Sequence, residues 1–405
     1  MPEYVIVALV MIALLIGGLM TAAAYFVLLE RWMAAWIQDR KGPNRVGIPL
    51  TNIKLFGLGQ PLADGVKFIL KEEYTPGHVD KFLYSLAPIS ILAAALASFA
   101  VVPVGDRLPA ILGYGPFDLT AAPGIDVGMI YVFALSSIAV YGVILGGWAS
   151  NNKYSFLGGL RSSAQLIAYE LPMGLGILGI VLASGSLRLE TIINTQASSG
   201  LWNVFWQPIG FVVFVIAAFA EAARLPFDLP EAEQELIGGY HTEYSGLRLL
   251  MYLVAEFLHM IMAAFLIVIL FLGGWHFWGL TGDATGEITW GQAILRHIIL
   301  MSKITGVILF FMLVRWSWPR FRFDQLMALA WKVMLPLGMV NLVVIAVLVE
   351  FQPQLIERAG GRGAASLLMI GASWLIGIIC WAAVAWATPL GTDNRPVHGK
   401  IGAME

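Results

Sequence analysis

Ionisable side chains stand inside apolar stretches of this sequence, where each charge is costly unless it is paired or hydrated. They are Glu170, Glu221, Glu256, His259 and Lys303. Glu256 and His259 are three residues apart, so they share one face if the stretch is helical. Carboxylates and an imidazole in apolar surroundings exchange protons near neutral pH, because desolvation moves their proton affinities toward that range. The pattern predicts a proton-transfer series. The alternative is that each acid, or His259, is a buried polar strut between helices and that Lys303 is a counter-ion for a carboxylate.

A second group of acids follows the apolar stretch that ends near residue 223. It comprises Asp228, Glu231, Glu233, Glu235 and Glu243. A helix start after Pro230 accounts for Glu231 and Glu233, because acids stabilise the first turn of a helix, but it does not account for the whole group. Acids this close repel one another. We therefore expect some of them to hold a proton, or to pair with Arg224 or with a partner protein.

Ligands for metals and redox groups are scarce. The chain has one cysteine, Cys380, which excludes disulfides, cysteine-ligated iron–sulfur clusters and cysteine-based zinc sites within a single chain. Only one of the six histidines, His259, lies deep in an apolar stretch, so a haem held by two histidines is not expected. The sequence also lacks a dinucleotide fingerprint, a P-loop and a nucleophile elbow. We expect no metal or prosthetic group on this chain. Any part in electron transfer would use a diffusible carrier such as quinone.

The elements that must position these groups are transmembrane helices. Of the 405 residues, 59% are hydrophobic and 12% are charged, whereas a soluble domain has roughly 25% charged residues. Backbone groups cannot stay unpaired in lipid, so apolar stretches of spanning length must be helical. These stretches are 4–29, 82–104, 127–149, 166–187, 206–223, 248–273, 297–315, 329–350 and 365–387, of which 206–223 is short. The sequence predicts an all-α integral membrane protein with about nine transmembrane helices.

Lysine and arginine are concentrated in alternate connections between these stretches. The connection after the first stretch is rich in both, whereas the opposite side has only Arg107, Arg188, Arg296, Arg358 and Arg362. By the positive-inside rule, the N-terminus is outside and the C-terminus is cytoplasmic. Within the first basic connection, residues 62–71 predict an amphipathic helix. This helix is either a brace on the membrane surface or part of a site.

Four motif blocks stand in order along the chain. They are Glu30-Arg31 with Arg40-Lys-Gly-Pro-Asn-Arg-Val-Gly47 and Gln60-Pro-Leu-Ala-Asp64-Gly-Val-Lys67; Ala164-Gln-Leu-Ile-Ala-Tyr-Glu170-Leu-Pro; the acidic connection from Ala220 to Gly246; and the basic block from Arg315 to Lys332. Together they resemble the family of H-type membrane subunits of complex I, the proton-translocating NADH:quinone oxidoreductase. The resemblance covers residues 25–350.

This resemblance implies a subunit without a redox centre of its own, within a multisubunit translocase. The subunit would form a quinone tunnel with peripheral-arm subunits and couple quinone reduction to proton translocation. The residues implied near the quinone path are Arg31, Arg40, Asp64, Arg320 and Arg322. The implied coupling carboxylates are Glu170, Glu221, Asp228, Glu231, Glu233, Glu235, Glu243 and Glu256. Quinone would be the substrate, and flavin and iron–sulfur clusters would belong to partner subunits. The protein would cross the cell inner membrane several times beside other complex I membrane subunits, with no nucleic-acid partner.

Two features depart from the family pattern. Ala223 stands where the family usually has Asn before Arg224, and the stretch 365–387 lies beyond the common eight-helix core. We therefore divide the chain into a domain resembling the H-type subunits, 1–350, and a C-terminal part, 351–405, with one extra helix and a short tail. Three alternatives stay open: the membrane subunit of an energy-converting hydrogenase, a proton-coupled secondary transporter and a structural membrane anchor. The basic block at 315–327 and the full acidic connection favour the quinone enzyme over the hydrogenase.

Overall fold

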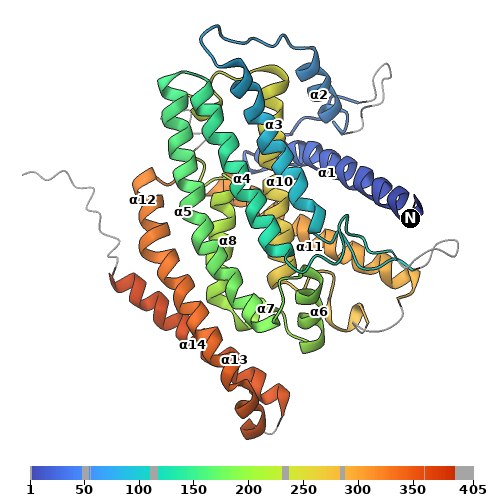
Figure 1. Cartoon of the computed structure of the whole chain (residues 1–405), viewed down its shortest axis with the longest axis vertical. Helices are drawn as coiled ribbons and strands as arrows, with labels where there is room; N and C mark the ends of the chain where they lie inside the picture. Colours follow the sequence, from blue (N-terminus) through green and yellow to red (C-terminus); the bar gives the residue numbers. More distant parts are fainter. Residues whose placement is uncertain are drawn as a thin grey trace, which may run out of the picture.

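The computed structural model describes residues 2–47, 54, 56–109, 117–229, 237–282, 288–359 and 361–387 (Figure 1). In these residues the regular structure is helical, apart from one isolated bridge between Leu108 and Phe117. Eight helices are long and apolar enough to cross a membrane, and one further apolar helix, Pro208–Glu221, is shorter. This arrangement confirms the predicted all-α membrane protein and the short segment within it. The orientation of the two termini remains a prediction.

The helices follow the predicted stretches closely. The long ones are α1 (Pro2–Ile37), α3 (Lys81–Ser98), α4 (Gly128–Ala149), α5 (Lys153–Ser184), α10 (Gly246–Phe271), α11 (Trp290–Ser317), α13 (Leu335–Ala359) and α14 (Arg362–Ala387). The short ones are α2 (Gln60–Leu70), α6 (Leu189–Ser199), α7 (Asn203–Trp206), α8 (Pro208–Glu221) and α12 (Phe323–Ala328). Three-residue helical turns lie at η1 (Phe99–Val101), η2 (Gly239–His241) and η3 (Trp278–Leu280). The π-helical segment η4 (Leu329–Met334) joins α12 to α13 in one continuous apolar helix.

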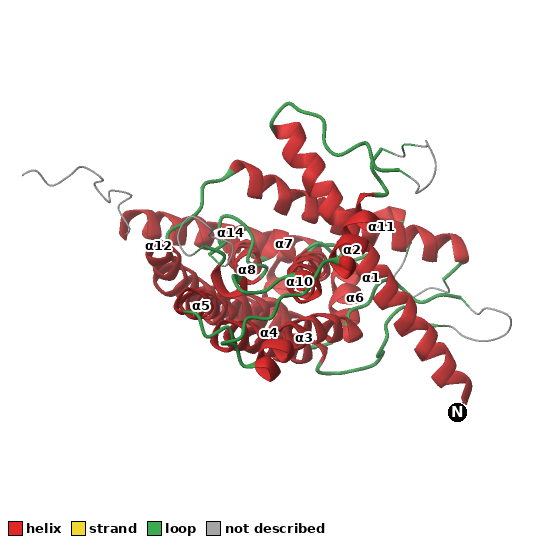
Figure 2. Ribbon diagram, turned by 90° about the horizontal axis from the view of Figure 1, so that it is seen from above, coloured by secondary structure: helices red, strands yellow, loops and turns green. Residues whose placement is uncertain are grey.

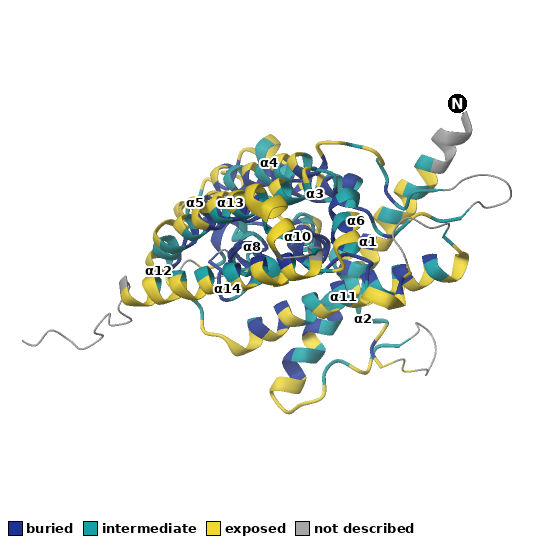
Figure 3. Ribbon diagram, turned by 90° about the horizontal axis from the view of Figure 1, so that it is seen from below, coloured by how far each residue is buried: buried dark blue, intermediate teal, exposed yellow. Residues whose placement is uncertain are grey.

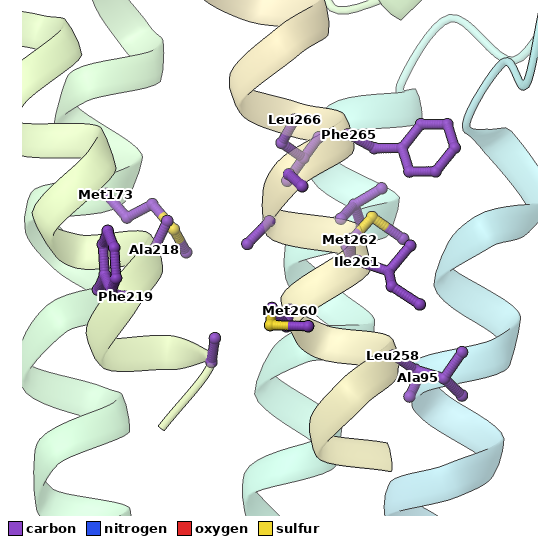
Figure 4. Packing of buried hydrophobic residues seen from close by; sticks show 14 of the residues in the cluster. Ala95, Met173, Ala218, Phe219, Leu258, Met260, Ile261, Met262, Phe265 and Leu266 are labelled. Carbon is purple, nitrogen blue, oxygen red and sulfur yellow. The ribbon is translucent and has the colours of Figure 1, made fainter. Parts of the chain in front are cut away.

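Helix α10 forms the centre of the bundle (Figures 1 and 2). Its apolar window is 83% buried inside the protein, against at most 44% for the other candidate spans. A helix that is apolar all round must be covered on every side, and Figure 3 shows α10 enclosed in this way. In Figure 4, Leu258 and Met262 of α10 lie between Ala95 of α3 and Met173 of α5. Because α10 also carries Glu256, this packing holds an ionisable group in the middle of the bundle.

Helix α8 begins at a break in the backbone and is completed by the extra C-terminal helix. Gln207 leaves the helical conformation at the end of α7, and Pro208, which has no N–H, starts α8. The carbonyl group of Phe205 next to this break accepts a 2.7 Å hydrogen bond from the indole Nε1 of Trp374 in α14. Exposed carbonyls are costly in lipid. Helix α14, which packs at the periphery against α7, α8 and α13, therefore covers a weak point of the backbone (Figure 1).

Lys303 of α11 ties down the connection that follows α10. Its ammonium group donates hydrogen bonds of 2.7, 2.9 and 2.7 Å to the carbonyls of Leu272, Gly274 and His276, and it lies 4.4 Å from the ring centroid of Trp202. The interpretation of Lys303 as a counter-ion for a carboxylate was therefore wrong. The physical reason is distance along α10: Leu272 is about 24 Å from Glu256 at ~1.5 Å per residue.

The predicted amphipathic segment is helix α2, at the same end of the bundle as the α4–α5 turn (Figure 1). Its apolar side chains Leu62, Ile69 and Leu70 are exposed in the isolated chain. On its polar face, Oδ2 of Asp64 lies 2.8 Å from Nη1 of Arg31 in α1. This ion pair fixes α2 beside the end of α1, where a cavity of about 1,380 Å³ opens.

Candidate functional site

A chamber with a volume of about 1,380 Å³ lies between α1, α2, the 40–46 segment, α10 and the end of α11. Its apolar lining comes from α1 and α10, for example Val27 and Leu253. The charged lining is mostly basic: Arg31, Arg40, Lys41, Arg45, Lys54, Lys67, Arg224 and Arg315, against Glu30, Asp64 and Glu256. Such a chamber suits a partly apolar ligand that acquires negative charge, because fixed cations compensate the charge where water is scarce.

One buried carboxylate, Glu30, organises two of the arginines. Its Oε1 lies 2.5 Å from Nη1 of Arg315, and its Oε2 lies 3.3 Å from Nη1 of Arg224. The Arg224 guanidinium also lies over the ring of Phe257, 4.2 Å from the centroid. Glu30 and Arg224 are both buried, so each charge compensates the desolvation cost of the other. Glu30 belongs to the first motif block but was not among the predicted site residues. Its position at the end of a long apolar stretch was the sequence feature that could have indicated a buried, paired carboxylate.

The predicted quinone-path residues separate into two places. Arg31, Arg40 and Asp64 line the chamber. Arg320 lies outside the residues that line it and pairs with the buried Asp228 of the α8–α10 connection, Nη2 to Oδ2 at 3.2 Å. Arg322 also lies outside that lining and stands at the N-cap of α12.

A small enclosed cavity of about 40 Å³ brings three of the predicted carboxylates together. Glu170 comes from α5, Glu221 from α8 and Glu256 from α10, and His259 of α10 lines the same cavity. This volume exceeds the ~10–15 Å³ that one water needs. The cavity therefore has room for water between these ionisable side chains.

Two serines of α4, which were not among the predicted site residues, donate hydrogen bonds to two of these carboxylates. Ser137 donates its hydroxyl hydrogen to Oε1 of Glu170, and Ser136 donates to Oε1 of Glu221. Consecutive residues on α4 thus reach acids on two different helices. A serine in an apolar helix is common, so the sequence offered no signal that would have distinguished this pair.

Glu256 lines both the chamber and the enclosed cavity. A second small cavity, of about 30 Å³, continues beyond the first and shares Ser136, Glu221 and His259 with it. Glu256 therefore stands between the chamber and two adjoining small cavities, whose walls are mostly apolar apart from these ionisable and hydroxyl groups. The hydroxyl of Tyr240 lies 3.3 Å from its Oε1.

The remaining predicted acids lie elsewhere. Glu243 accepts a 2.6 Å hydrogen bond from Nδ2 of Asn152, at the end of the bundle where α5 begins. Glu231, Glu233 and Glu235 lie outside the residues that the structure describes.

Gln165 of α5 holds the start of the acidic connection in place. Its Nε2 donates to the carbonyls of Ala220 and Phe227, at 2.8 and 2.7 Å. Gln165 belongs to the same motif block as Glu170. Its two hydrogen bonds connect that block to the start of the α8–α10 connection. Among the described residues, the structure shows no cluster of histidine, cysteine or acid that could hold a metal ion.

Comparisons with known proteins point to one family. A family model described as NADH dehydrogenase matches residues 9–346. The chain is 44% identical to the H-type subunit of the NADH-quinone oxidoreductase of Flavobacterium psychrophilum over 325 residues, which cover 80% of this chain and 92% of the relative. It is 45% identical to an H-type subunit of the same enzyme from Geobacter metallireducens over 333 residues, covering 82% and 93% of the two chains. Helix α14 lies beyond the residues that the family model matches.

Proposed function

The chain belongs to the NADH dehydrogenase family as an H-type subunit of NADH-quinone oxidoreductase, and we propose that its chamber receives the quinone while its enclosed cavity carries protons. The protein is a multi-pass membrane subunit of complex I, an oxidoreductase. It has other complex I subunits as partners.

The chamber matches the needs of quinone reduction. Quinone accepts two electrons and two protons to become quinol, so negative charge builds up on its oxygens until the protons arrive. Arg31, Arg40, Arg224 and Arg315 supply positive charge to that chamber. The apolar lining from α1 and α10 suits a lipid-soluble ring and tail.

The observation that carries the proposal is the position of Glu256. Its carboxyl group borders the chamber on one side and the cavity of Glu170 and Glu221 on the other. A change of charge in the chamber acts most strongly on the nearest ionisable groups in low dielectric. Glu256 would respond by binding or releasing a proton and would pass the change to Glu221 and Glu170.

The other predicted acids belong to the connection between α8 and α10. We propose that Asp228, which pairs with Arg320, is a coupling carboxylate together with Glu231, Glu233, Glu235 and Glu243, as the family resemblance implies. Arg322, next to Arg320 in the basic block, belongs to the same region. The quinone-handling part is residues 1–350, and the part from 351 to 405 supplies α14.

Flavin and iron–sulfur clusters belong to partner subunits in this proposal. A peripheral arm that carries them would dock beside α2, where Phe56 and Leu70 are each 79% exposed. The complex would lie in the cell inner membrane, with these connections on the cytoplasmic side.

The test uses the assembled complex in membrane vesicles. Replacing Glu256→Gln keeps the shape of the side chain and removes its proton exchange. Proton pumping linked to quinone reduction should then fall strongly, whereas NADH oxidation by an artificial acceptor that bypasses the quinone should stay unchanged. Glu350→Gln, in α13 and outside both cavities, is the matched control. Undiminished pumping in Glu256→Gln would remove the proton path from the proposal.

A further inference from the structure

Tyr240 is a buried aromatic residue at the carboxylate cavity. It lies in η2, on the connection between α8 and α10, and its side chain is 2% exposed. The backbone of η2 is pressed closely against α5: a Cβ atom on Gly158 would lie 2.7 Å from the Cα of Gly239. Gly239 also has a φ of +59°, a conformation that glycine adopts without strain. These two glycines let η2 approach the bundle closely enough for the Tyr240 ring to reach its interior.

The ring of Tyr240 is held by aromatic neighbours. It packs edge to face against Tyr252 of α10 with centroids 5.1 Å apart, and against His241 with centroids 5.0 Å apart. Such pairs add to the stability of a buried ring. The ring is thereby aimed so that its hydroxyl lies 3.3 Å from Oε1 of Glu256.

Glu256 is surrounded by ionisable groups from several elements. Glu170 of α5, Glu221 of α8 and His259 of α10 share its enclosed cavity. Arg224, from the α8–α10 connection, and Glu30, Arg31 and Arg315, from α1 and α11, share its chamber. Tyr240 adds a phenolic hydroxyl to this set, which can donate a hydrogen bond to the carboxylate.

On the basis of the proposed function, we propose that Tyr240 is a positioning residue of the proton path. Its hydroxyl holds the carboxyl group of Glu256 at the wall between chamber and cavity and stabilises the ionised form. The physical reason is that a donor to a carboxylate favours the charged state over the protonated one. Tyr240 belongs to the α8–α10 connection. A shift of η2 would therefore lengthen this hydrogen bond and favour protonation of Glu256.

The experiment compares Tyr240→Phe with Tyr252→Phe in the assembled complex. Both variants keep the ring and lose one buried hydroxyl; the hydroxyl of Tyr252 donates to the carbonyl of Gly142 at 3.3 Å. We would measure the pH profile of quinone reduction coupled to pumping, with assembly checked by NADH oxidation through an artificial acceptor. In Tyr240→Phe, the acidic limb of the profile should move to higher pH by about one unit, the size expected for losing one donor to a charged group. Tyr252→Phe should keep the wild-type profile.

The outcomes separate this inference from the proposed function. If Glu256→Gln abolishes pumping and Tyr240→Phe has the same profile as Tyr252→Phe, the role of Tyr240 is overturned and the proton path stands. If Glu256→Gln pumps normally, both are overturned, since Tyr240 acts through Glu256. Equal shifts in the two tyrosine variants would indicate a general packing effect and would also overturn the specific role.

Discussion

Nη1 of Arg315, in the last turn of α11, lies 2.5 Å from Oε1 of Glu30 near the end of α1. The second oxygen of Glu30 faces Arg224 of the α8–α10 connection. Three segments far apart in the sequence are thus joined through one carboxyl group on the chamber wall. The arrangement holds two guanidinium groups toward the chamber while neutralising part of their mutual repulsion.

Replacing Glu30→Gln should destabilise the complex and weaken quinone binding. Removing one partner of a buried ion pair costs about 3–5 kcal/mol, because the remaining charges lose their compensation. The measurements are thermal unfolding of the purified complex and the KM for a soluble quinone analogue. The control is Asp118→Asn, which breaks the partly exposed pair with Arg107 and should cost about 0–1 kcal/mol. A Glu30→Gln complex as stable as the control would contradict a stabilising role for the ion pairs of Glu30 with Arg224 and Arg315.

Replacing Ser137→Ala should slow quinone reduction coupled to pumping by roughly tenfold, the effect of losing one hydrogen bond to a charged group. Ser137 donates to Glu170 across the α4–α5 interface, and without it the carboxyl group loses its fixed position. The check is the initial rate of pumping in vesicles. Ser90→Ala is the control, because Ser90 donates to the carbonyl of Ala87 in its own helix. Equal rates in the two variants would show that the donor is dispensable.

Replacing Trp374→Phe should lower stability by about 1 kcal/mol, since one hydrogen bond to a backbone carbonyl is lost while most of the ring packing remains. The affected carbonyl is that of Phe205 at the break before α8. Thermal unfolding in detergent measures the change. Trp381→Phe, on the exposed face of the same helix, should leave the unfolding temperature unchanged. The idea that α14 covers the break fails if both variants unfold at the wild-type temperature.

Acidification should destabilise the end of the bundle where His276 is buried. Burial lowers the pKa of His276, and the nearby Arg296 guanidinium lowers it further. The folded state therefore prefers the neutral imidazole, whereas the unfolded chain takes up a proton near pH ~6.5. The stability that depends on His276 is complete above that pH and is lost progressively below it.

This prediction is checked by unfolding temperatures at pH 7.5 and 5.5. His276→Gln should lose less stability between the two pH values than the wild type does. The exposed His78→Gln should lose as much as the wild type. A His276→Gln complex with the full wild-type pH dependence would assign the effect to other groups.

Much of the fold followed from the sequence. The apolar stretches predicted the spanning helices, including the short one that became α8 and the peripheral one that became α14. The four motif blocks pointed to the family that the comparisons then showed. Glu170, Glu221 and Glu256 were singled out by their depth in apolar surroundings, and the structure brings these three together.

The contacts between the helices could not be predicted from the sequence. Glu30 and Arg224 are 194 residues apart, and Ser136 and Glu221 are 85 apart, so no local spacing relates them. The prediction for Lys303 was wrong because its ammonium group lies beyond the end of α10, far along that helix from Glu256, and the sequence did not show which segment would lie there.

The sequence by itself determined that the chain is a bundle of membrane helices with acids at depth. Lipid imposes a helix on each segment separately, because every backbone N–H and C=O group within it must be hydrogen-bonded and every charge must be paired or hydrated. Only the tertiary structure decided which acids share a cavity. It also decided that Glu256 borders both the chamber and the cavity of Glu170 and Glu221. Those facts depend on how each helix is rotated and tilted against its neighbours, and side-chain packing across the whole bundle sets these quantities.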